Sequence, residues 1–329
     1  MDYVLSARNV RKGEFRNEPG KSSYLLVPPN ELPSPDHSVA KGKWVKQLTE
    51  AATWGETDMP DGTKIPRGDV VVFVHGYNNG PDAIMWRHRM LSKTLTAAGF
   101  KGAVMSFDWP SASMAIGYLE DRHDAKKTAM QLVTDGIATL AGLQERGCCI
   151  NVHLLGHSTG AYVIREAFDD ADDAHLASAS WMASQVVFIG GDISAESLTD
   201  RNPSSDSLFR HCHRVTNYSN LEDRVLKLSN IKRAGLAPRV GRVGLPDGHP
   251  STAVNIDCSD YFSGIQDEKG PIFEQDQVGS EGTFCHSWHI GNKVFAADLF
   301  ETLRGDKDRK VIPTRHTSPE GKLILRAPL

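Results

Sequence analysis

Ser158 is the residue best suited to covalent chemistry, because it lies at the centre of a Gly-His-Ser-Thr-Gly segment. An apolar run precedes this segment and small residues follow it, as expected for a strand, a sharp turn and a helix. In such a turn we expect a strained backbone at Ser158, and side chains at Gly156 or Gly160 would collide across it. The segment therefore predicts a nucleophile elbow, with Ser158 at a helix N-terminus that favours a developing negative charge.

A serine presented in this way needs an acid and a histidine, which follow it in that chain order. Asp223 comes shortly after a predicted strand at 214–218, so we predict that it is the acid. Two alternatives stay open at this point. Asp192, which follows a strand predicted at 185–189, could be the acid instead. Asp223 could also simply begin a helix, where its charge interacts favourably with the helix dipole.

The chain has 13 histidines, so position must identify the base. His286 lies beyond the strand predicted at 253–258 and just before a final predicted helix, where an imidazole can reach the carboxyl edge of the sheet. We predict that His286 is the base. His289 is close enough to compete for this role, whereas His316 lies in a polar tail, where a solvated histidine is expected.

Acyl transfer also needs N–H donors for the developing oxyanion. The residue after the nucleophile, Thr159, supplies one backbone N–H, and the loop after the strand predicted at 70–74 supplies the second. In that loop we predict the Tyr77 N–H as the donor, with the Asn78 side chain as the second choice.

Two histidines and two tryptophans lie in the same loops. We expect His75 and His157 to hydrogen-bond backbone groups rather than to take part in the chemistry. Trp109 and Trp288 could line the substrate site, which would favour apolar or aromatic acyl or alcohol groups. The alternative for both tryptophans is packing in the core.

The elements that must position these residues alternate between strands and helices. The run at 70–74 consists of β-branched and aromatic residues, as expected for a strand buried on both faces. This alternation predicts an α/β fold with a doubly wound, mostly parallel sheet. Strands at 3–7 and 22–27, joined by a turn around 17–20, are expected to form an antiparallel N-terminal edge.

One domain over residues 1–329 is the simplest organisation. It divides into N-terminal edge strands and a connector (1–68), a catalytic core (69–304) and a C-terminal tail (305–329). Strands are predicted at 70–74, 103–107, 150–155, 185–189, 214–218 and 253–258, and a short helix at 43–54. The modest spacing between the fourth and fifth of these strands favours at most a small cap over the site.

Composition restricts the partners. The 329 residues are 40% hydrophobic and 24% charged with a net charge of -4, which gives no reason to expect nucleic acid or an anionic membrane. No apolar run is long enough to cross a bilayer, and the N-terminus shows no signal peptide. The five cysteines lack CxxC spacing, so we expect reduced thiols and a cytoplasmic protein. Neither a metal nor a cofactor is predicted, and the oligomeric state is left open.

Five segments, in this order, resemble the α/β-hydrolase superfamily, and within it a bacterial branch of uncharacterised serine hydrolases. They are Val-Phe-Val-His-Gly-Tyr-Asn-Asn (72–79), Phe-Asp-Trp-Pro-Ser (107–111), Leu-Leu-Gly-His-Ser-Thr-Gly (154–160), Asp-Arg-Val-Leu (223–226) and Cys-His-Ser-Trp (285–288). The resemblance covers roughly residues 69 to 304 and departs from the branch at Cys285, where glycine is common. It implies an α/β-hydrolase sheet and a serine hydrolase of esterase, lipase or thioesterase type, without a cofactor.

The expected reaction is therefore hydrolysis of a small-molecule carboxylic ester or thioester through an acyl-enzyme. An acyltransferase or an amidase would use the same triad. A non-catalytic binding protein on this fold would normally show a broken triad, whereas Ser158, Asp223 and His286 supply all three residue types in order.

Overall fold

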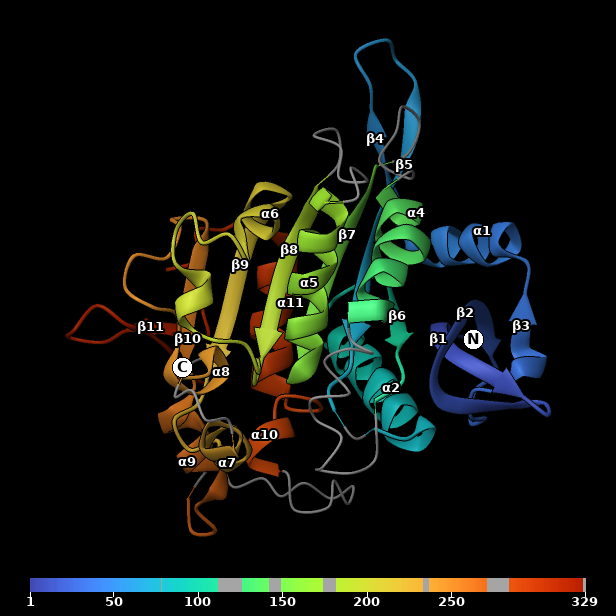
Figure 1. Ribbon diagram of the computed structural model, residues 1–329. Coiled ribbons are helices and arrows are strands. Elements are labelled where there is room, and N and C mark those ends of the chain that lie inside the picture. Colours follow the sequence, from blue (N-terminus) through green and yellow to red (C-terminus); the bar gives the residue numbers. More distant parts are fainter. Residues whose placement is uncertain are drawn as a thin grey trace.

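A computed structural model of the chain describes residues 1–77, 79–111, 126–141, 149–173, 182–232, 237–270 and 284–327. Over these residues the strands form one sheet (Figure 1). The strands are β1 (Asp2–Arg11), β2 (Glu14–Val27), β3 (Ser38–Val39), β4 (Thr53–Asp58), β5 (Lys64–Val74), β6 (Ala103–Asp108), β7 (Cys149–His157), β8 (Ala183–Ile189), β9 (Cys212–Ser219), β10 (Ala253–Asp257), β11 (Arg315–Thr317) and β12 (Leu323–Leu325).

The strand order is β11-β12-β10-β9-β8-β7-β5-β6-β1-β2-β3, and β4 pairs with β5 outside this path. Neighbours from β12 through β10, β9, β8, β7, β5 and β6 to β1 are parallel. Antiparallel pairs lie at the margins, where β2 joins β1 and β3, β4 joins β5, and β11 joins β12. The prediction of a mostly parallel α/β sheet with an antiparallel N-terminal edge is confirmed.

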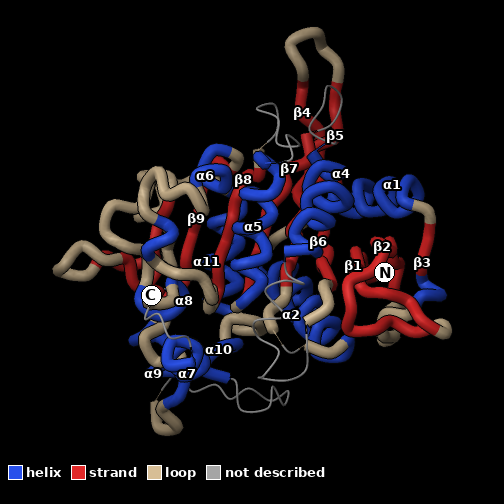
Figure 2. The backbone as a smooth tube through the Cα atoms, viewed as in Figure 1, coloured by secondary structure: helices blue, strands red, loops and turns tan. Residues whose placement is uncertain are grey.

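Helices cover both faces of this sheet (Figure 2). They are α1 (Lys41–Ala52), α2 (Pro81–Ala98), α4 (Ala138–Ala141), α5 (Thr159–Asp173), α6 (Asp206–Arg210), α7 (Arg224–Lys232), α8 (Val240–Val243), α9 (Ser259–Gln266), α10 (Phe284–Ser287) and α11 (Lys293–Arg304), with a π-helical segment at Leu132–Ile137. One core joins the sheet to α1, α5 and the π-helical segment, and the other joins it to α2, α9 and α11.

The central strand β5 explains why two cores form. Val70, Val72 and Val74 enter one core, while Val71 and Phe73 enter the other. All five side chains are fully buried, because successive residues of a strand point to opposite faces and helices cover both. This agrees with the continuous apolar pattern of the sequence. It also places the carboxyl ends of β5, β7, β8 and β9 along one edge of the sheet.

The N-terminal edge differs from the prediction in its turn. The chain reverses at Lys12 and Gly13, whose φ angles of +52° and +76° are the left-handed pair that a tight hairpin requires. Residues 17–20 lie inside β2 instead, where Pro19 pairs with Arg8 between two register shifts. The proline and glycine in that segment accommodate a bulged strand rather than a turn. β1 itself pairs with β6 in parallel.

Two further segments depart from the prediction. β4 and the first part of β5, over residues 53–68, form a hairpin that projects beyond the sheet, so β5 begins at Lys64 rather than near Asp69 (Figure 1). The C-terminal tail is part of the sheet, because β12 pairs with β10 and β11 pairs with β12. A buried pair, Arg315 Nη2 to Asp298 Oδ1 at 2.6 Å, fastens this tail to α11. His316 lies in β11 and not in a solvated tail.

None of the helices in the described part of the chain combines the length and the apolar content needed to cross a membrane.

Candidate active site

Ser158 occupies a sharp turn between β7 and α5, with a φ angle of +55°. A residue with a Cβ atom pays about 1–3 kcal/mol to hold such a conformation, so the surrounding structure must enforce it. Two backbone hydrogen bonds do so: the Ser158 N–H donates to the Ile189 carbonyl, and the Asp192 N–H donates to the Ser158 carbonyl, both at 3.0 Å. The expected strained turn at the end of β7 is present.

The glycines around Ser158 are required by close backbone approaches. A Cβ on Gly156 would lie 2.8 Å from the Ala161 Cα, across the turn, as the sequence predicted. A Cβ on Gly160 would lie 2.1 Å from the Val74 carbonyl oxygen. That collision is with the end of the neighbouring strand β5, rather than across the turn. Gly160 therefore allows α5 to begin directly against the β5 loop.

The loop after β5 lies against the serine. A Cβ on Gly76 would approach the Ser158 Cβ to 2.6 Å, so only glycine allows this contact. Tyr77 follows Gly76, whereas Asn78 lies outside the described residues. On the other side, Thr159 is the first residue of α5, and the first N–H groups of a helix have no acceptor within it. Both predicted donor segments thus border Ser158.

Asp223 and His286 form a buried pair. The His286 Nδ1–H donates to Asp223 Oδ2 at 2.6 Å, and the two residues are 5% and 1% exposed. The other carboxylate oxygen of Asp223 accepts the Leu226 N–H at 2.9 Å, in the first turn of α7. The two roles considered for Asp223 from the sequence, helix start and histidine partner, are therefore held by different oxygens of the same carboxylate.

The alternative acid and base do not join this pair. Asp192 is 3.2 Å from Nε of Arg239, and both residues are buried. The two ring nitrogens of His289 have no hydrogen-bond partner among the residues that the structure describes, and the ring stacks on Trp288 at 4.1 Å between centroids. Burial, and then the neighbouring His286, hold the pKa of His289 well below its ordinary value. His289 is therefore a neutral residue of the core.

His286 is held by its neighbours at the elbow. His157 Nε2–H donates to the His286 carbonyl at 3.1 Å, and the two rings lie 4.9 Å apart. Gly190, with a φ angle of +53°, lies so close to His286 that a Cβ added at Gly190 would be 3.0 Å from the His286 Cε1. The His286 Nε2 has no hydrogen-bond partner in the described part of the chain, so it is not bonded to the Ser158 hydroxyl here.

His75 and His157 bond to backbone groups, as expected. The His75 Nδ1–H donates to the Gly76 carbonyl at 2.8 Å, and the Trp109 N–H donates to His75 Nε2 at 3.2 Å. Burial lowers the pKa of both histidines, and the nearby His286 and then Arg87 lower that of His157 further. The imidazoles of His75 and His157 are therefore neutral.

Trp109 and Trp288 occupy the core rather than a substrate surface. Trp109 is fully buried, its indole N–H donates to the His75 carbonyl at 2.8 Å, and its ring stacks on that histidine. Trp288 is 3% exposed and contacts Tyr261 and Phe262. Both tryptophans therefore pack in the core, as in the alternative expected from the sequence, and neither is exposed to contact a substrate.

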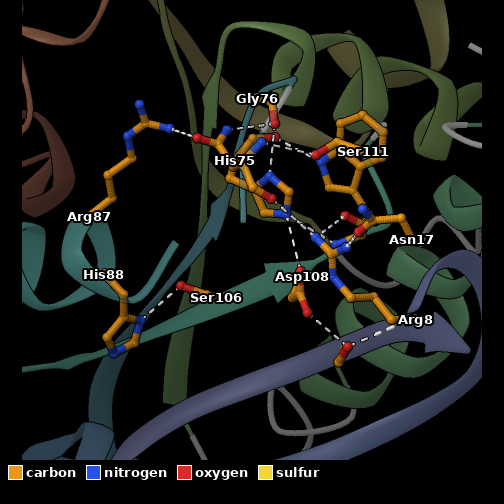
Figure 3. Close-up of polar contacts among 12 residues, drawn as sticks. Arg8, Asn17, His75, Gly76, Arg87, His88, Ser106, Asp108 and Ser111 are labelled. Carbon is orange, nitrogen blue, oxygen red and sulfur yellow. Dashed lines mark hydrogen bonds and ion pairs between the residues drawn. The ribbon is translucent and has the colours of Figure 1, made fainter. Parts of the chain in front are cut away.

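Four polar residues behind the site were not singled out from the sequence: Arg8, Asn79, Arg87 and Asp108. Each is buried, and Figure 3 shows three of them, Arg8, Arg87 and Asp108, around His75 and Gly76. Arg87 was detectable, because it is a cation on the same helix face as the apolar residues of α2.

Over the described ranges no cluster of three or more metal-binding side chains was found.

The match to a protein family agrees with this architecture. Residues 51–253 match the family described as "Alpha/beta hydrolase of unknown function (DUF900)". Solved structures that resemble the chain include a protein of Lactobacillus plantarum described as a cell surface hydrolase (12% identity, 73% of this chain and 91% of that chain, TM-score 0.39). Others are an esterase/lipase from an uncultured bacterium (13% identity, 85% and 94%, TM-score 0.35) and a dienelactone hydrolase-like promiscuous phosphotriesterase from metagenomic libraries (17% identity, 74% and 89%, TM-score 0.33). No curated protein matches the sequence. Because the family match spans more than half of its length, the chain belongs to this α/β-hydrolase family.

Proposed function

We propose that the protein is a serine hydrolase that cleaves carboxylic esters or thioesters through an acyl-enzyme. The observation that carries the proposal is the buried 2.6 Å pair of Asp223 and His286 beside a serine held at a φ angle of +55°. A strained serine on an elbow is costly, and such strain concentrates at functional sites. A buried carboxylate on Nδ1 of an imidazole leaves the Nε2 of that ring as the proton acceptor.

The proposed chemistry has two steps. His286 Nε2 takes the Ser158 hydroxyl proton while Oγ forms a bond to the substrate carbonyl carbon, and Asp223 stabilises the resulting imidazolium. The same proton then passes to the leaving alkoxide or thiolate, the bond to that group breaks, and an acyl-serine remains. In the second step His286 removes a proton from water, hydroxide attacks the acyl carbon, and the proton returns to Ser158 as the acid leaves.

The Thr159 and Tyr77 N–H groups are proposed to hold the oxyanion in both steps. Loss of one such donor typically costs about 3 kcal/mol of transition-state stabilisation. The Asn78 side chain remains the second choice for the donor from the β5 loop. In the resting structure Ser158 and His286 Nε2 do not share a hydrogen bond. Catalytic hydrogen bonds often tighten only when substrate binds, so the proposal expects this contact to form in the complex.

A fluorophosphonate probe, which modifies activated serines, tests the proposal. The wild type should be labelled, while Ser158→Ala and His286→Ala should lose labelling. His289→Ala is a matched control, because it removes a neighbouring buried imidazole that does not contact Asp223, and it should keep labelling. Absence of labelling that depends on Ser158 would overturn the proposal in favour of a binding protein.

The substrate class follows from turnover. p-Nitrophenyl esters of rising acyl length, a matched thioester and a matched anilide should be compared with and without an acceptor alcohol. Ester or thioester hydrolysis in water alone supports the proposal. Turnover only with the acceptor alcohol would identify an acyltransferase, and preference for the anilide would identify an amidase.

A further inference from the structure

We infer that Asn79, held by Arg87, is a positioning residue that orients the Gly76–Tyr77 peptide toward the reacting carbonyl. This inference rests on the proposed function, because that peptide carries the proposed oxyanion donor. It assigns a role to a buried amide and a buried cation that the proposed chemistry itself does not use.

The Gly76 carbonyl is fixed from two sides. It accepts the His75 Nδ1–H at 2.8 Å and the Asn79 Nδ2–H at 2.7 Å. The Gly76 C=O and the Tyr77 N–H belong to one peptide, and in a planar trans peptide these two groups point in opposite directions. Bonds that hold the oxygen on the side away from the substrate therefore set the direction of the N–H group.

Such bonds are needed because Gly76 does not restrict its own backbone. Glycine is required at this position by the contact with Ser158, yet it allows the following peptide plane to rotate more freely than any other residue would. A donor that must reorient during the reaction loses the advantage of a preorganised site. The hydrogen bonds to the Gly76 oxygen supply the order that the missing side chain cannot.

Arg87 determines which way the Asn79 amide faces. Its guanidinium donates to the Asn79 Oδ1, and a guanidinium has no acceptor atom. The Asn79 oxygen must therefore face Arg87, which directs the NH2 group to the carbonyls of Gly76 and Tyr77, the latter at 3.1 Å. Asn79 and Arg87 are 5% and 7% exposed, so water competes little for these bonds.

The same guanidinium reaches the segment that carries the base. Its Nη2–H donates to the Ser287 Oγ at 3.3 Å, and Ser287 directly follows His286. Arg87 thus links the β5 loop to α10, the helix that carries the proposed base. The Asn79 N–H is fixed separately, because it donates to the Ser111 Oγ at 3.3 Å.

Asn79→Asp is the most direct test, because it conserves shape and reverses one interaction. One carboxylate oxygen still pairs with Arg87, so the fold should be retained. The other oxygen would face the carbonyls of Gly76 and Tyr77 and repel them, which would turn the peptide. We expect kcat to fall roughly 100-fold, the loss typical of one oxyanion donor, with KM changed less than threefold.

Asn79→Ala is a second variant, which removes the amide's bonds to the Gly76 and Tyr77 carbonyls and to Arg87 but leaves the His75 bond to the Gly76 oxygen. It should lower kcat roughly tenfold, with KM again little changed. Ser106→Ala is the matched control, because it removes a buried hydrogen bond of 2.8 Å between β6 and His88 of α2 without touching the β5 loop. This control should lower the unfolding midpoint but leave kcat within threefold of the wild type.

Affinity for an alkyl boronic acid, which mimics the tetrahedral intermediate, separates positioning from a structural role. It should weaken in parallel with kcat in both Asn79 variants and stay constant in Ser106→Ala. If folded Asn79→Asp or Asn79→Ala keeps wild-type kcat and boronate affinity, or if Ser106→Ala loses as much, the inference is overturned. Failure of the wild type to label at Ser158 would instead contradict the proposed function, so the two failures are distinct.

Discussion

Replacing Arg8 by methionine should leave a buried carboxylate without its counter-ion. The side chains of Arg8 and Asp108 are 2% and 4% exposed, and Nε lies 2.7 Å from Oδ1. Although burial opposes ionisation, the Arg8 guanidinium holds the pKa of Asp108 below its ordinary value of 3.8. In Arg8→Met the Ser6 hydroxyl still donates to Asp108, at 2.9 Å, but the positive charge is gone.

The size of the effect follows from the choice left to Asp108. The unpaired carboxylate can remain charged or bind a proton, and protonating a group of pKa 3.8 at pH 7 costs about 4 kcal/mol. That cost caps the charge penalty and agrees with the roughly 3–5 kcal/mol seen when one partner of a buried pair is removed. At pH 5 the same cap is about 1.6 kcal/mol.

The stability of the wild type and the stability of Arg8→Met depend on pH with opposite signs. In the wild type the folded pKa of Asp108 is lowered, so its contribution to stability is constant between pH 5 and 7 and is lost only at lower pH. In Arg8→Met the folded pKa rises above the unfolded one, so stability is lost as the pH rises. The destabilisation should therefore shrink by about 2–3 kcal/mol between pH 7 and pH 5.

Urea unfolding followed by tryptophan fluorescence measures this directly. Wild type, Arg8→Met, Asp108→Asn and the double variant should be compared at pH 7 and pH 5. The double variant has no charge to strand, so relative to the wild type it should show no such pH dependence. An Arg8→Met penalty that is equal at the two pH values, or simple additivity of the two substitutions, would refute the reasoning.

Three other predictions concern strain, close contact and a buried histidine. Ser158→Gly should be more stable to urea than Ser158→Ala by about 0.5–1 kcal/mol, because glycine adopts the left-handed conformation without a Cβ penalty; equal stabilities would show that the turn is unstrained. Gly160→Ala should lower the free energy of unfolding by about 2–3 kcal/mol, because its Cβ would collide with the Val74 carbonyl oxygen. Gly42→Ala, whose Cβ would meet no atom within 4 Å, should not be destabilised in the same urea assay. Burial lowers the pKa of His88 to about 4, so the folded protein binds a proton at His88 less readily than the unfolded chain does. The free energy of unfolding should therefore decrease as the pH is lowered from 7. Between pH 7 and 5 the loss from His88 should be about 2 kcal/mol, and it should be absent from urea titrations of His88→Asn.

Local spacing around Ser158 and the chain order of the acid and the histidine predict the residues of the proposed triad. The two glycines around Ser158 reflect contacts within a few residues of the turn, or with the strand next to it. Asp223 and His286 are 63 positions apart, yet chain order restricts both to loops at one edge of the sheet. The apolar runs also predict the sheet, because a strand that is buried on both faces is apolar at successive residues and can be recognised from its own segment alone.

The remaining contacts depend on residues distant in the chain. Arg8 and Asp108 are 100 positions apart, and nothing near either residue indicates a partner. The attachment of the C-terminal tail to α11 depends on Arg315 and Asp298, a buried ion pair that involves a segment with the sequence character of a polar tail. The predicted turn at 17–20 is wrong because a proline and a glycine are also compatible with a bulged edge strand.

Rapid acid quench followed by mass spectrometry tests the central claim most directly. During turnover of a p-nitrophenyl ester, the peptide that contains Ser158 should gain the mass of the acyl group in step with a nitrophenolate burst of at most one equivalent per chain. Asp223→Asn should slow that acylation by roughly 10⁴, because the imidazole would no longer be held in the tautomer that accepts the serine proton. Turnover without an adduct on Ser158, or turnover by Ser158→Ala at the wild-type rate, would contradict the account.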